Sequence, residues 1–195
     1  RVAHDAEFFP ATKAYVRAGD VMRMTVIRGD KNVPTTTNDL KWVTAMRCLN
    51  AVTTPGVHKG LTISAVDDVK RLLPYVPADV DSIGYNLEGV MTPDSDYTNM
   101  PQSVAAFSKI VRASGRKFSF GPIRNTWTAL EKRGQFDGVL KNCDAVGLQM
   151  QRFFESGRPT ADLLAEVRPL VQKFKTANPN VQVNIQLWLG RQTVP

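Results

Sequence analysis

Four strand-like segments of this chain repeat one design, with apolar side chains on one face and small or amide side chains on the other. Side chains alternate across a β-strand with a period of two, so each segment has an apolar and a polar face. Amphipathic helical segments separate the four. Strands that alternate with helices predict a parallel sheet with helical crossovers. The chain is therefore expected to be an α/β protein.

The polar faces of these segments indicate what kind of sheet they form. They consist of Ser82, Gly84, Asn86 and Glu88, then Ser119 and Gly121, then Gly147, Gln149 and Gln151, and finally Asn184, Gln186 and Trp188. Strands of a doubly wound sheet are covered on both sides and are apolar throughout. A polar face on every strand fits better where that face looks into a barrel lumen. The large polar residues come last, which places Glu88, Gln151 and Trp188 at the C-terminal mouth, where (β/α) barrels hold their sites.

The remaining elements determine how much of a barrel the chain supplies. Residues 21–28 form a fifth strand, and Ser64 is expected to cap a helix that runs to about residue 73. Further helices are predicted at 39–49, around 104–111, at 125–133, around 136–143 and from Thr160 to about 176. A closed eight-stranded barrel takes ~250 residues, and this chain has 195. The sequence therefore predicts a (β/α) TIM-type barrel that is incomplete or trimmed, in a single domain over residues 1–195.

Composition narrows the classes of function. Hydrophobic residues make up 43% and charged residues 22%, which is ordinary for a soluble globular protein. No apolar run approaches the ~20 residues of a membrane span. The net charge is +7, but the basic residues are scattered, which favours a solvated surface over a nucleic-acid site. The chain begins at Arg1 and not at methionine, which favours a processed or trimmed product.

Cysteine and histidine are too sparse for a metal centre. Cys48 and Cys143 lie far apart, and two buried free thiols are favoured over a disulfide. His4 and His58 are too few and too separated for a zinc site. We therefore expect no metal and no cofactor.

The segment Val80–Glu88 resembles the fourth-strand signature of chitinase-like (family 18) glycoside hydrolases. In that signature, alternating apolar and acidic positions lead to a glutamate, and Asp81, Ile83, Tyr85, Asn86 and Glu88 fit it if asparagine replaces one acid. Ser82 stands at the glycine of the signature and Gly84 at its first inner acid. KFSFGP and DAVGLQMQRF are similar to the fifth and sixth strands of that family. The similarity covers roughly residues 79–190.

The resemblance implies a glycoside hydrolase that acts on N-acetylated glycans. The glutamate of the family protonates the glycosidic oxygen while the acetamide of the substrate attacks the anomeric carbon. This implies that Glu88 is the general acid and that Asn86 orients the acetamide. The residues expected to bind the carbohydrate ligand are Gln149, Gln151, Gln186, Trp188 and Tyr85. Trp188 would stack on a sugar ring.

Three alternatives remain open at the level of sequence. The alternative to an enzyme is a non-catalytic chitinase-like barrel that binds carbohydrate or serves as a structural extracellular protein, so enzymatic activity is undecided. For Glu88, a structural ion pair with an inward arginine such as Arg23 is the alternative to a role in a site. The amides and Trp188 are also compatible with a filled core. We expect a secreted or extracellular protein, and the sequence indicates no oligomeric state.

Overall fold

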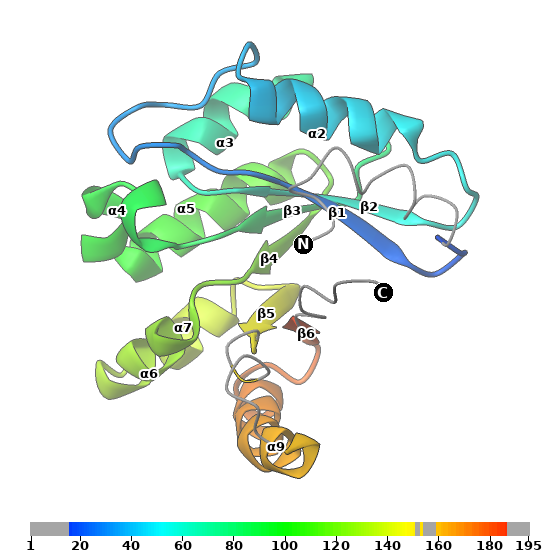
Figure 1. Cartoon of the computed structure of the whole chain (residues 1–195). Helices are drawn as coiled ribbons and strands as arrows, with labels where there is room; N and C mark the ends of the chain where they lie inside the picture. Colours follow the sequence, from blue (N-terminus) through cyan, green and yellow to red (C-terminus); the bar gives the residue numbers. More distant parts are fainter. Residues whose placement is uncertain (1–15, 151–152, 154–158, 187–195) are drawn as a thin grey trace.

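The computed structural model describes residues 16–150, 153 and 159–186. Six strands form one sheet in chain order, and every neighbouring pair is parallel. The strands are β1 (Val21–Val26), β2 (His58–Ile63), β3 (Ser82–Tyr85), β4 (Lys117–Phe120), β5 (Ala145–Gln149) and β6 (Gln182–Gln186). The sheet curls into a half-barrel, as Figure 1 shows. The parallel α/β architecture expected from the sequence is thus confirmed for the described residues.

Helices cover the convex side of the sheet (Figure 1). They are α2 (Leu40–Ala51), α3 (Val66–Leu72), α4 (Asp94–Thr98), α5 (Met100–Ala113), α6 (Arg124–Lys132), α7 (Phe136–Leu140) and α9 (Thr160–Ala177), with 3-10 turns at Leu73–Tyr75 and Gly89–Met91. Gly115 follows α5 with a φ of 77°, the left-handed conformation that glycine adopts without a steric penalty. Pro169 lies inside α9, which continues through it.

The hydrophobic core lies between the sheet and this helical layer. Alternate residues of the central strands supply it, namely Ile83, Tyr85, Leu87, Phe118, Phe120, Val146 and Leu148, and all of them are fully buried. The ring of Tyr85 stacks on Phe107 of α5 at 4.4 Å, and Phe120 packs edge-on against Trp127 of α6 at 5.2 Å. The apolar face predicted for these strands is therefore the helix-covered face, and the polar face is the concave one.

Strand β2 was missed in the sequence analysis. Its segment, HKGLTI, begins with two polar residues and a glycine, so it lacks a clean alternation. The structure explains why a glycine stands at position 60, because a Cβ there would lie 3.1 Å from Cζ of Arg23 on the neighbouring strand. The side chain of Arg23 thus occupies space that a larger residue in β2 would fill.

The predicted helix cap at Ser64 is wrong by one residue. The N-cap of α3 is Ala65, and the Ser64 hydroxyl instead accepts a hydrogen bond from the Arg28 backbone N–H at 3.2 Å. The first-turn N–H of Val66 donates to Asp96 Oδ2 at 3.0 Å. A carboxylate thirty residues away in the sequence therefore performs the capping that a local serine was expected to perform.

Two further predictions concern β6 and the cysteines. The alternation of the last strand-like segment places Ile185 opposite Asn184 and Gln186, on the face expected to be buried, but Ile185 is 44% exposed. β6 is the last described strand and has one described neighbour. Cys48 and Cys143 are free and buried, as expected. Within the described ranges, no helix combines the length and the hydropathy that crossing a bilayer requires.

Candidate functional site

The concave face of the sheet holds a cavity of about 330 Å³. Every described strand contributes to its lining, which includes Arg23, Thr25, Thr62, Gly84, Asn86, Glu88, Ser119, Gly121, Gly147, Gln149, Asn184 and Gln186. Nine of these twelve belong to the predicted polar faces, and Arg23, Thr25 and Thr62 come from β1 and β2. Parallel strands point the same way, so the cavity has a floor near the strand starts and a rim near their C-terminal ends.

Glu88, Asn86 and Gln149 meet at the rim. The side-chain nitrogen of Gln149 donates to Glu88 Oε1 at 3.1 Å, and it lies 3.4 Å from Asn86 Oδ1 and 3.1 Å from the Gly121 carbonyl oxygen. Glu88 is partly exposed and Asn86 is buried. The structure thus brings together three of the predicted site residues, contributed by segments about sixty residues apart in sequence.

Thr92 and Tyr97, which the sequence analysis did not identify, hold the backbone of this rim. The Thr92 hydroxyl accepts from the Glu88 N–H at 3.1 Å and donates to the Asn86 carbonyl at 3.3 Å. The Tyr97 hydroxyl accepts from the Gly89 N–H at 2.6 Å. Burial and the nearby Glu88 carboxylate raise the pKa of Tyr97. No periodic pattern marks either residue, because both follow the strand in an irregular loop and a short helix.

Arg23 crosses the floor of the cavity. Its Nη1 donates to Ser119 Oγ at 2.9 Å and its Nη2 donates to Ser82 Oγ at 3.0 Å. The guanidinium therefore reaches from β1 over β2 to side chains of β3 and β4. Burial lowers its pKa to about 10, which leaves it protonated at neutral pH. The sequence analysis predicted an inward Arg23, and the structure confirms that direction.

The ion pair between Arg23 and Glu88 that competed with a site role is not formed. Arg23 bonds to serine hydroxyls at the floor, whereas Glu88 bonds to Gln149 at the rim. Gly84 explains the room for Arg23, since a Cβ at that position would lie 2.5 Å from Nη1. The resemblance to chitinase-like proteins implies an inner acid at position 84. This chain has a glycine there, and a cation from β1 occupies the adjacent space.

The Tyr85 side chain points into the core, away from Glu88 and Asn86. It lines the cavity wall, but its ring is buried in the core and its hydroxyl donates to Asp96 Oδ2 at 2.7 Å. Alternation explains this orientation, because Tyr85 lies between two cavity-facing residues and so points the opposite way. Gln186 lines the cavity. Gln151 and Trp188 lie outside the described residues.

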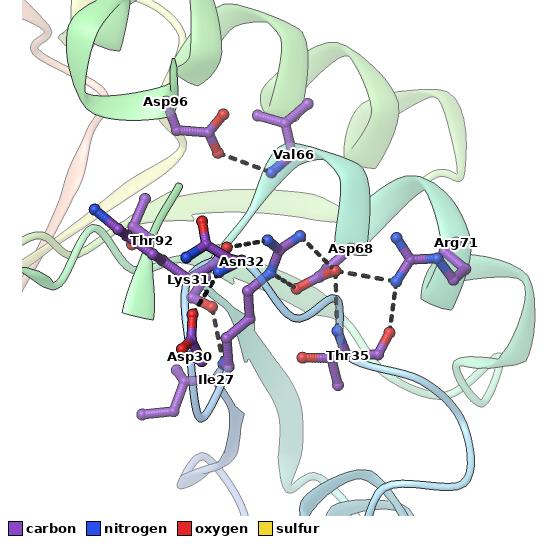
Figure 2. Close-up of polar contacts among 12 residues, drawn as sticks. Ile27, Asp30, Lys31, Asn32, Thr35, Val66, Asp68, Arg71, Thr92 and Asp96 are labelled. Carbon is purple, nitrogen blue, oxygen red and sulfur yellow. Dashed lines mark hydrogen bonds and ion pairs between the residues drawn. The ribbon is translucent and has the colours of Figure 1, made fainter. Parts of the chain in front are cut away.

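An ion-pair network centres on Asp68 of α3. The Asp68 carboxylate is fully buried and accepts from Arg28 Nε at 2.7 Å, Arg71 Nη1 at 3.1 Å and the Thr35 N–H at 3.2 Å (Figure 2). Burial lowers the pKa of Arg28, but the Asp68 carboxylate outweighs it, so the pKa is raised. The network joins the end of β1 to α3, and its groups satisfy one another and not a ligand.

Comparisons with known proteins give no family. No protein-family model matches the chain, and neither the curated proteins nor the solved structures contain a match. Among the described residues, no three His, Cys, Asp or Glu side chains gather as ligands for a metal ion. The geometry of the cavity is therefore the basis for the proposals that follow.

Proposed function

We propose that this chain is part of a (β/α) TIM-type barrel, similar to chitinase-like glycoside hydrolases, that binds N-acetylated glycans in its concave cavity. The observation that supports this most is the meeting of Glu88, Asn86 and Gln149 at the rim, a carboxylate beside two amides. Amide groups offer both donors and acceptors, which suits sugar hydroxyls and an acetamide. The C-terminal ends of the strands are where barrels of this type hold their ligands.

In this proposal Glu88 is the general acid. It donates its proton to the glycosidic oxygen as the bond from that oxygen to the anomeric carbon breaks. The acetamide oxygen of the substrate forms the new bond to the anomeric carbon, and water later cleaves it. Asn86 orients the acetamide, Gln149 holds the Glu88 carboxyl in place, and Gln186 binds a hydroxyl. Thr92 is a positioning residue for the Asn86 and Glu88 backbone.

Replacing Glu88 with glutamine tests this role. E88Q keeps the size of the side chain and the oxygen that accepts from Gln149, so the melting temperature should change little. Loss of the acid should reduce turnover of chitooligosaccharides or N-glycans by ~100-fold or more. Glu131, an exposed carboxylate paired with Lys173 on the helical side, provides the matched control E131Q, which should retain full activity. Unchanged turnover in E88Q would remove the catalytic assignment.

The second candidate function is that of a non-catalytic barrel that binds carbohydrate or serves as a structural extracellular protein. The surroundings of Gly84 favour this non-catalytic function. Chitinase-like enzymes carry an acid at the corresponding position, whereas here the Arg23 guanidinium occupies the adjacent space. This candidate expects glycan binding without product release from any chitooligosaccharide. A wild-type turnover assay separates the two functions, since any Glu88-dependent product excludes the second one.

A further inference from the structure

Arg23 is a partly buried cation without a carboxylate partner among the described residues. Elsewhere in the described residues, four arginines form ion pairs with carboxylates, and these are Arg28, Arg71, Arg112 and Arg124. Arg23 instead has two neutral serine hydroxyls. Withdrawing a charge from water without a counter-charge is costly even when the burial is partial. Because Arg23 lines the floor of an open cavity, an anion in that cavity can supply the missing counter-charge.

The groups around Arg23 are rich in hydrogen-bond donors. A guanidinium has five N–H donors, and the bonds to Ser82 and Ser119 use two of them. Each serine accepts with its oxygen and still has its own O–H to donate. The hydroxyls of Thr25 and Thr62 line the same cavity. A positive charge surrounded by hydroxyl donors matches the oxygens of an anion.

The strands next to the Arg23 guanidinium carry glycines where a side chain would collide with it. A Cβ at Gly84 would lie 2.5 Å from Nη1, and a Cβ at Gly60 would lie 3.1 Å from Nε. Neither glycine has the positive φ that would explain it by conformation. The two glycines therefore leave room for the Arg23 guanidinium, whose position depends on residues of β1, β2 and β3.

We propose that Arg23, Ser82 and Ser119 form an anion subsite, and that the ligand of the cavity is an acidic glycan carrying a carboxylate or sulfate group. This inference rests on the proposed function and names its substrate class. Both anions present the paired oxygens that a guanidinium fork binds with two parallel hydrogen bonds. Gly84 and Glu88 are four residues apart, about 13 Å along an extended chain. The acidic group thus binds well below the rim, in a ligand of more than one sugar unit.

Equilibrium binding to the full chain tests the subsite without requiring turnover. The probes are a hyaluronan tetrasaccharide, the same tetrasaccharide with its carboxyl groups reduced to alcohols, a sulfated chondroitin tetrasaccharide and neutral chitotetraose, each titrated by calorimetry. A charge-assisted pair should make at least one acidic probe ~10-fold tighter than the reduced probe. The hyaluronan and chondroitin arms distinguish carboxylate from sulfate.

Variants assign the preference to Arg23. R23Q should remove the difference between acidic and reduced probes, while R133Q, which alters an exposed arginine and changes the net charge equally, should retain it. G84A should weaken the preference with all charges kept, because its Cβ displaces Nη1. R23M should leave the melting temperature unchanged or raise it, since a partly buried charge without a counter-charge stabilises little.

The outcomes separate this inference from the proposed function. Equal affinity of the wild type for acidic and reduced probes overturns the anion subsite, even if all variants fail to fold. If chitotetraose binds equally well too, the glycan proposal survives alone. If none of the probes binds, both are removed. An acid preference that persists in R23Q, or a collapse of the melting temperature in R23M with that preference intact, assigns Arg23 to structure instead.

Discussion

Tyr85 and Asp96 illustrate how one residue of the segment 80–88 contributes to the buried core. The Tyr85 hydroxyl and the Val66 N–H donate to the same oxygen of the buried Asp96 carboxylate, at 2.7 and 3.0 Å. Burial, together with the Asp96 charge, raises the pKa of Tyr85 far above its usual range. The phenol therefore stays protonated and remains a donor throughout the pH range in which the protein is handled.

The substitution Tyr85→Phe removes this donor and leaves a buried carboxylate with one fewer partner. Hydrogen bonds to charged groups contribute about 1.5–3 kcal/mol, so Y85F should lower the free energy of unfolding by about that amount in a urea titration. Y75F is the matched control, because Tyr75 is exposed, and its effect should stay within about 0.5 kcal/mol. If Y85F left stability unchanged but abolished glycan binding, Tyr85 would belong to the site after all.

For single residues, the sequence predicted the face to which a side chain points better than it predicted the hydrogen-bond partners of that side chain. Alternation correctly turned Arg23, Asn86, Glu88 and Gln149 to the concave face, because the period of a strand depends on the backbone alone. It offered Glu88 as a partner for Arg23, and the structure has serines there instead. Partners depend on the register between strands distant in sequence, which no single segment encodes.

Among the elements, α3 is tied to the end of β1 by charge as well as by packing. Arg28 donates to both oxygens of Asp68 at 2.7 and 2.9 Å, and both side chains are buried. The Arg28 guanidinium also donates to the Lys31 carbonyl at 2.6 Å. The same network thus orders the chain that follows β1, which contacts α3 through Thr35 (Figure 2).

Replacing Asp68 with asparagine should therefore destabilise more than one element. Breaking a buried ion pair by removing one partner costs about 3–5 kcal/mol, because the other charge stays buried and uncompensated. D68N should lower the free energy of unfolding by roughly 3 kcal/mol in a denaturant titration. The adjacent Asp67 is exposed and pairs with the exposed Lys70, so D67N should cost less than about 0.5 kcal/mol. Similar losses in the two variants would contradict the role of this network.

Element prediction succeeded where a segment follows its own period. The strands at 117–120 and 145–149 and the helix at 124–132 were expected within a few residues of where they lie. The prediction missed β2 because Gly60, which interrupts the alternation, makes room for Arg23 on the neighbouring strand. The predicted cap at Ser64 was wrong because the Asp96 carboxylate accepts the hydrogen bond from the first turn of α3. Both misses are cases in which a tertiary contact outweighs a local rule.

For the whole molecule, the open curl of the sheet determines which parts are least protected. β3 and β4 lie in the middle of the six strands and are buried on the helix side, whereas β6 is half exposed along its length. Among the described strands, β1 and β6 each have one neighbour. Opening an end strand breaks one set of hydrogen bonds, while opening β3 disrupts the core. Amide exchange should therefore be slowest in β3 and β4.

The same topology predicts how a ligand in the cavity affects both ends of the sheet. Its lining includes Thr25 from β1 and Gln186 from β6, strands at opposite ends of the sheet. A glycan that contacts both should slow amide exchange in both strands together, because ligand binding adds to the free energy of each local opening. Hydrogen exchange measured with and without a saturating acidic tetrasaccharide checks this, and E131Q serves as a control that should respond as the wild type does. Protection confined to the helices would place the ligand on the convex side and exclude the cavity as its site.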